Sequence, residues 1–113
     1  MKYFKLSEFE CPCCKKNKIN KELLGMLDEA RELAGIPFKI SSGYRCVKHN
    51  KAVGGVPNSS HLVGKAVDIK GTGQKQKMII QALRNSGFLR LGIARTFVHA
   101  DIDHSKPIGT WYY

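Results

Sequence analysis

The chain has 113 residues, which is enough for one domain, expected over residues 1–113, and its 42% hydrophobic residues exclude a largely disordered chain. No apolar run approaches the roughly 20 residues of a membrane-spanning helix, and the start lacks the apolar stretch of a secretory signal peptide, so we expect neither feature. The net charge of +10 would attract polyanions, but the basic residues form no stripe interleaved with aromatic residues, so we expect no nucleic-acid partner and consider an anionic cell wall or a solvated basic surface.

Four cysteines occur, three of them within four positions: Cys11, Cys13, Cys14 and Cys46. Reduced thiols are the default without an export signal. One disulfide from the first group to Cys46 is a second possibility. A structural zinc site is a third, although the adjacent Cys13 and Cys14 would strain a tetrahedron. The sequence leaves these three states open.

Two segments have the pattern of amphipathic helices. Asn20 can cap a helix that runs to Ala34, and Gly35 then provides a C-terminal stop. A second helix is predicted over residues 74–85, with Gly87 after its end. Both place apolar residues at helical spacing, which predicts one buried face each.

Short apolar or alternating runs predict strands over residues 38–41, 66–70, 89–94 and 97–103. The polar, glycine-containing segment 43–60 is long for a connection in so small a domain, and long ordered loops are often functional. The order of elements predicts an α+β domain with helices packed on a mainly antiparallel sheet.

A histidine and a carboxylate stand seven positions apart around a glycine. Val67 and Ile69 are expected to point into the core, so the alternation of a strand sends Asp68 to the opposite face. A turn at Gly64 can bring His61 back beside Asp68. A carboxylate in mid-strand needs a partner, which a cation or a salt bridge can provide.

The last predicted strand repeats this pattern. Its apolar face carries Val98, Ala100 and Ile102, and its polar face carries His99, Asp101 and Asp103. Two histidines and one aspartate would be a suitable ligand set for catalytic zinc, because three protein ligands leave one coordination position open. A solvent-facing sheet surface is the alternative explanation of the spacing.

Several motifs together resemble the peptidase M15 family. They are Ser42-Gly43-Tyr44-Arg45, His49-Asn50, Val53-Gly54-Gly55, and a Ser-x-His-x-x-Gly-x-Ala-x-Asp element from Ser59 to Asp68. This family comprises zinc D-Ala-D-Ala carboxypeptidases and peptidoglycan endopeptidases that share a fold with hedgehog signalling domains. The segment Phe97–Asp101 is similar to its final metal-ligand strand, and Leu6–Phe9 with the cysteines is similar to its small bacterial and phage branch.

The resemblance implies roles for individual residues. It implies that His61, Asp68 and His99 bind Zn²⁺ and that Arg45 and Ser59 contact substrate. A surface ion pair is the alternative for Arg45. His49 is expected to line the cleft or to stabilise its loop, and His104 and Asp103 are expected to be solvated.

One position departs from the family pattern. Many relatives carry Glu or Asp three positions before the last ligand histidine as general base, and this chain has Thr96 there. Asp101 shares a strand face with His99, so we expect it either to act as the catalytic base or to orient a ligand histidine.

The function implied by the resemblance is metal-assisted hydrolysis of amide bonds in peptidoglycan stem peptides. The reaction would be that of a D-Ala-D-Ala carboxypeptidase or of an endopeptidase of the endolysin type, carried out by a monomer. The alternative is a non-catalytic, zinc-containing module that binds the cell wall. We expect synthesis in the cytoplasm and action on the bacterial wall, with a phage or prophage origin as one explanation of the missing signal.

Overall fold

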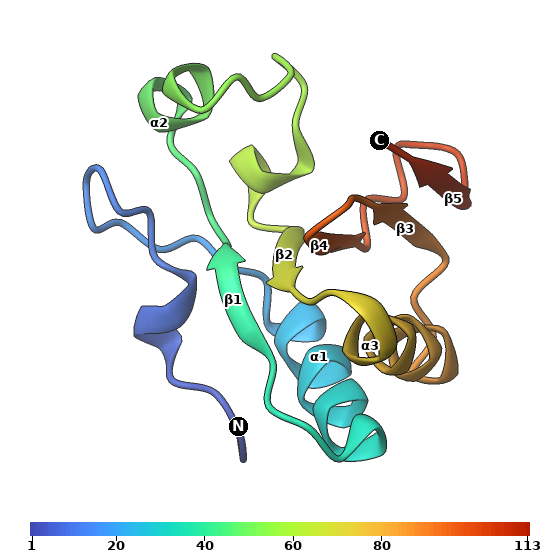
Figure 1. Cartoon of the computed structure of the whole chain (residues 1–113). Coiled ribbons are helices and arrows are strands. Elements are labelled where there is room, and N and C mark those ends of the chain that lie inside the picture. Colours follow the sequence, from blue (N-terminus) through green and yellow to red (C-terminus); the bar gives the residue numbers. More distant parts are fainter.

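The computed structural model describes residues 1–113, and its helices gather mainly on one side of a single sheet (Figure 1). In chain order the elements are the 3-10 helix η1 (Leu6–Phe9), α1 (Lys21–Ala34), β1 (Lys39–Ser42), α2 (Val47–Ala52), the 3-10 helix η2 (Ser60–Val63), β2 (Ala66–Lys70), α3 (Gly73–Asn85), β3 (Arg90–Ile93), β4 (Phe97–Asp101) and β5 (Gly109–Tyr112). None of the helices combines the length and the apolar content needed to cross a bilayer.

The long helix α1 begins and ends where its sequence signals predict. The Asn20 side chain accepts a hydrogen bond from the backbone N–H of Leu23, and Gly35 adopts a left-handed conformation with φ of 67°. An asparagine cap satisfies a free N–H at the helix start, and a glycine tolerates positive φ at the helix end. The two caps therefore set the boundaries of α1.

The sheet has the strand order β1-β2-β4-β3-β5. All pairs are antiparallel except β3 with β5, which run parallel, so the predicted α+β class with a mainly antiparallel sheet is confirmed. Two predicted strands are shorter than expected, because β3 covers 90–93 and β4 ends at Asp101. The sequence did not predict β5 or the short helix α2, which lies inside the predicted long loop.

The core lies between the sheet and the helices α1 and α3. Val67 and Ile69 of β2 and Val98 and Ala100 of β4 are fully buried there. They pack with Leu23, Leu27 and Ala30 of α1 and with Ile79, Ala82 and Leu83 of α3. The alternation predicted for both strands is thus confirmed, and it leaves their polar side chains on the opposite face.

Gly64 makes the turn between η2 and β2, and this turn places η2 over the polar face of the sheet. It has a φ of 70°, and a Cβ at this position would lie 1.9 Å from the backbone oxygen of Lys18. Its carbonyl accepts a hydrogen bond from the N–H of Asn20, which caps α1. Only glycine fits this position, both for its backbone conformation and for the space available.

Gly64→Ala is therefore expected to destabilise the protein by more than about 2 kcal/mol, because left-handed backbone and a steric clash add. Gly54→Ala is a matched control, since Gly54 also has positive φ (76°) but a Cβ there meets nothing within 4 Å. The control should cost only about 1–2 kcal/mol. Urea unfolding of both variants measures the difference, and equal losses would contradict the steric explanation.

Candidate metal centre

The register of two strands places an aspartate beside a histidine. Asp68 of β2 pairs directly with His99 of β4, and both side chains lie on the face opposite the core. His61 comes from η2, which the turn at Gly64 folds back over the sheet. Ligand atoms of the three residues all lie within 4.8 Å of one another, and the exposed fractions are only 2% for His61, 6% for Asp68 and 8% for His99.

One carboxylate oxygen is shared by both imidazoles. Asp68 Oδ1 lies 3.2 Å from His61 Nε2 and 3.0 Å from His99 Nδ1. Burial by itself would raise the pKa of Asp68, but these contacts with His61 and His99 outweigh burial and hold the pKa well below its usual range. Asp68 is therefore an ionised carboxylate at neutral pH.

The remaining nitrogen of each ring fixes the tautomer. His61 Nδ1 lies 2.7 Å from the carbonyl oxygen of Gly43, and His99 Nε2 lies 2.7 Å from Asp101 Oδ2. Both partners accept hydrogen bonds, so these two nitrogens carry the protons. In neutral rings the other nitrogens then direct lone pairs toward the Asp68 carboxylate.

Three acceptor atoms that face one another in a buried site need a cation between them. The set of two imidazole nitrogens and one carboxylate oxygen is that of a catalytic zinc site, and the hydrogen bonds to the outer nitrogens are those that orient histidine ligands. The group formed by His61, Asp68 and His99 thus fits Zn²⁺. Burial opposes protonation of His99, but its contacts with Asp101 and Asp68 outweigh burial and raise its pKa. A proton on His99 would therefore compete with a metal ion for the same nitrogen.

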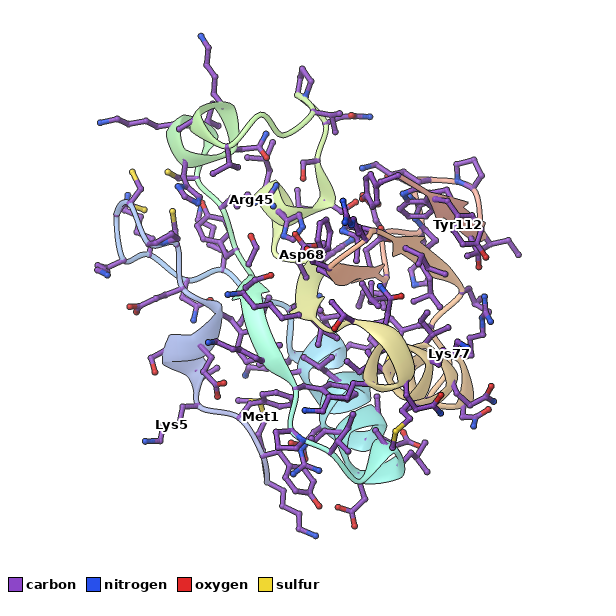
Figure 2. All side chains as sticks on the ribbon, viewed as in Figure 1. Met1, Lys5, Arg45, Asp68, Lys77 and Tyr112 are labelled. Atoms are coloured by element: carbon purple, nitrogen blue, oxygen red, sulfur yellow. The ribbon has the colours of Figure 1, made fainter.

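A cavity of about 470 Å³ opens over this group. Its size is that of an ordinary small-ligand site. Arg45 lines it, and Figure 2 shows this side chain directed toward Asp68. Its guanidinium donates hydrogen bonds to Ser42 Oγ (2.9 Å), Asn50 Oδ1 (3.2 Å) and Asp68 Oδ2 (3.2 Å). Arg45 is therefore a positioned, largely buried cation and not a partner in a surface ion pair.

The two other residues expected at the substrate differ in position. Ser59 lines the cavity, and its Oγ accepts a hydrogen bond from the N–H of His61, so Ser59 caps the start of η2. His49 is half-buried on α2 and is not among the residues that line the cavity. Its backbone N–H donates to Cys46 Sγ at 3.4 Å, so it contributes to the start of α2.

Asp101 is buried and fully engaged in hydrogen bonds. Oδ2 accepts from His99, while Oδ1 accepts from Arg90 Nε at 2.7 Å and from the N–H of Asp103 at 3.1 Å. Burial would raise the pKa of Asp101, but hydrogen bonds from His99, the Asp103 backbone and Arg90 lower it. Its carboxylate is thus ionised and turned toward these partners.

The prediction that Asp103 is solvated is wrong. The residue is 7% exposed, and its carboxylate accepts hydrogen bonds from Ser60 Oγ (2.8 Å) and Ser105 Oγ (2.6 Å). Burial opposes ionisation, but these bonds outweigh it and lower the pKa of Asp103 to about 2. Asp103 therefore ties the chain after β4 to η2, whereas His104 is exposed as expected.

The cavity wall also contains residues that the sequence did not single out, among them Arg90, Lys106, Trp111 and Tyr113. Arg90 Cζ lies 4.8 Å from the centre of the Trp111 ring, and that ring lies 5.5 Å from the ring of His99. The position opposite Trp111 is Gly92, where a Cβ would lie 2.6 Å from the indole nitrogen. The aromatic residues near the C-terminus could have indicated a binding surface, but their position at the cavity depends on the parallel pairing of β5 with β3.

Comparison with known proteins agrees with this geometry. The profile of the family described as Peptidase M15 matches residues 2–103. A zinc D-Ala-D-Ala carboxypeptidase of Streptomyces albus G is 38% identical over 55 residues, which are 49% of this chain and 22% of that protein. The match thus spans less than a quarter of that relative's length.

Replacing either candidate histidine ligand is expected to abolish zinc binding at this centre. His61→Ala and His99→Ala should each lower zinc affinity by more than about 100-fold, beyond the effect of losing an orienting partner. Metal analysis after dialysis against a mild chelator, compared with wild type, measures the loss. His104→Ala is the control because His104 is exposed and should keep the full metal content. Wild-type zinc content in both ligand variants would refute the assignment.

Proposed function

The chain belongs to the peptidase M15 family, and on this premise we propose that it is a zinc peptidase that hydrolyses amide bonds in the peptide stems of bacterial peptidoglycan. The observation that supports this proposal most directly is the convergence of His61, Asp68 and His99 beneath a cavity of about 470 Å³. A zinc ion bound there would supply a Lewis acid that polarises the scissile carbonyl and lowers the pKa of water to about 7.

The cationic side chains of the cavity suit a peptide that carries carboxylates. A guanidinium has five N–H donors, and Arg45 uses three of them on Ser42, Asn50 and Asp68. Two N–H groups are thus left for a substrate carbonyl or carboxylate oxygen, in a fixed position next to a metal ligand. Positioned donors of this kind stabilise the negative charge that develops on the carbonyl oxygen during amide hydrolysis.

Neighbouring residues define where the peptide lies. Ser59 can donate its hydroxyl hydrogen to a substrate oxygen, because its own oxygen already accepts from the N–H of His61. Trp111 and Tyr113 contribute aromatic rings to the lining of the cavity, and Val53 and Val56 contribute aliphatic side chains. The peptide would contact these apolar groups where it lies over the metal centre.

The bond cut is part of the proposal. The related Streptomyces enzyme is named as a D-Ala-D-Ala carboxypeptidase, which supports hydrolysis at the end of the stem peptide. An endopeptidase of the endolysin type is the second possibility, since the cavity is open to solvent where residues 53–56 form its rim. Both reactions place the protein at the bacterial cell wall, to which a net charge of +10 would attract it.

Defined peptidoglycan fragments test the reaction directly. We expect the zinc-loaded protein to release a product whose mass identifies the bond, either terminal alanine or an internal fragment. His99→Ala should reduce turnover by at least about 10³-fold because it removes a metal ligand. Mass spectrometry of the products measures both. Absence of any product from carboxypeptidase and endopeptidase substrates with the metal in place would contradict peptidase function.

For Asp101 we propose that its main role is to orient His99. Its oxygens are occupied by His99, Arg90 and the Asp103 backbone, which leaves little freedom to accept another proton. Carboxylates that hold a ligand histidine in this manner raise metal affinity by fixing the ring and its tautomer. The competing assignment is that Asp101 acts as the catalytic base, because Thr96 occupies the position where many relatives carry a carboxylate.

Asp101→Asn separates the two roles. If Asp101 orients His99, the variant should bind zinc about 10–100-fold more weakly, and excess zinc should partly restore turnover. If Asp101 is the catalytic base, zinc affinity should be unchanged and turnover should be lost even at saturating zinc. Zinc titration and a cleavage assay on the same preparation measure both quantities. Asp103→Asn is the matched control, because Asp103 is also a buried carboxylate on this segment but contacts neither histidine.

A non-catalytic zinc module that binds the wall is a second candidate, and one observation favours it. Asp68 and Asp101 are the only carboxylates that line the cavity, and both are occupied by hydrogen-bond partners. Thr96 is exposed in the turn before β4 and does not line the cavity. Tight zinc binding and wall binding without cleavage of any fragment would support this candidate.

A further inference from the structure

A second group of metal-binding side chains lies away from the cavity. Cys11, Cys14 and Cys46 place their sulfur atoms within 4.8 Å of one another. Figure 2 shows sulfur atoms, in yellow, gathered between the blue N-terminal loop and the green chain that enters α2. Two of these residues are close in sequence, and the third comes from a segment more than 30 residues later.

The spacing of the sulfur atoms is that of thiolates around one ion. Cys11 Sγ lies 3.6 Å from Cys46 Sγ, and Cys46 Sγ lies 3.9 Å from Cys13 Sγ. Four thiolates bonded to zinc at about 2.3 Å in a tetrahedron lie about 3.8 Å from one another. The sulfur atoms of a disulfide lie about 2.05 Å apart, so all four cysteines are free thiols here.

The backbone around Cys11 forms a tight turn that brings two cysteines of a Cys-x-x-Cys spacing together. The N–H of Cys11 donates to the carbonyl of Lys16, and the N–H of Lys15 donates to the carbonyl of Cys11, both at 2.8 Å. Lys15 adopts a left-handed conformation with φ of 62°, which is uncommon for a residue other than glycine. This turn directs Cys11 and Cys14 to the same side of the loop, toward Cys46.

Backbone N–H groups point at the sulfur atoms, as they do around metal-bound thiolates. The N–H of Cys46 lies 3.5 Å from Cys11 Sγ, and the N–H of His49 lies 3.4 Å from Cys46 Sγ. These contacts favour the thiolate form that a metal requires.

We propose that Cys11, Cys14 and Cys46 bind a second, structural Zn²⁺ ion. Cys13, whose Sγ lies 3.9 Å from Cys46 Sγ, is the candidate for the fourth coordination position, although its adjacency to Cys14 would strain the tetrahedron. Soft thiolate ligands in a tetrahedral arrangement select zinc over magnesium or calcium. Closed sites with four protein ligands stabilise a fold and hold no substrate. This proposal is independent of the peptidase reaction, since it concerns residues outside the cavity.

The position of this zinc explains what it would stabilise. Cys46 follows Arg45 and caps α2, because its Sγ accepts the N–H of His49. Two residues earlier, the N–H of Tyr44 donates to the carbonyl of Phe9 at 2.8 Å, and the carbonyl of Gly43 accepts from His61. The second zinc would therefore fasten residues 43–46 to the N-terminal loop, and those residues in turn hold Arg45 and His61.

Metal counting tests the proposal. Protein purified in reductant with zinc present is expected to hold two zinc ions per chain, and the double variant H61A/H99A is expected to keep one. C11S/C14S should also keep one, at the first centre. Replacement of zinc by cobalt should produce thiolate-to-cobalt charge-transfer absorption in wild type and in H61A/H99A, but not in C11S/C14S.

A measurement without cysteine substitution covers the case in which C11S/C14S fails to fold. In H61A/H99A, bound zinc should protect the thiols from a thiol-reactive chromophore, and a strong chelator should make them reactive with release of one zinc. Loss of all zinc from H61A/H99A, with its four thiols freely reactive, would overturn the proposal. A Cys11–Cys46 disulfide in protein prepared with zinc and without reductant would also overturn it.

Discussion

The buried carboxylate of Asp68 is the group on which the arrangement of this site depends. It stands in the middle of β2, whose neighbouring residues Val67 and Ile69 are fully buried in the core. A charge in such a place requires several favourable partners, since burial opposes ionisation. The partners are His61, His99 and Arg45, which come from three different segments and meet at one carboxylate.

The outer contacts of these partners explain why the centre is ordered. His61 is oriented by the carbonyl of Gly43, and His99 is oriented by Asp101, which is itself held by Arg90. Each orienting group is a hydrogen-bond acceptor, so both rings turn their free lone pairs inward. Residue 43 also lies against the backbone of Phe9, where a Cβ would come within 2.7 Å. The geometry of the metal centre is thus connected through residues 43–46 to the cysteine-rich N-terminal loop.

Local sequence patterns were sufficient to predict the elements whose boundaries depend on residues close by in the chain. The caps at Asn20 and Gly35 defined α1, and the alternation of apolar residues defined the buried faces of β2 and β4. The missed strand β5 is short and exposed, and it exists because β3 offers a free edge to pair with. The missed helix α2 has six residues and begins at a cysteine whose capping role depends on the folded loop. Such elements have no local signal strong enough to predict them.

The sequence by itself determined the α+β class, the polar strand faces that carry Asp68 and His99, and, through its motifs, the resemblance to zinc peptidases. These features depend on residue order and on the period of a strand, which are local properties. Only the tertiary structure decided that Asp101 is enclosed by His99 and Arg90, that Asp103 is buried, and that Cys46 meets the cysteines of the N-terminal loop. These contacts join residues through strand pairing and loop packing, and whether a polar side chain is solvated or enclosed depends on what the rest of the chain places over it.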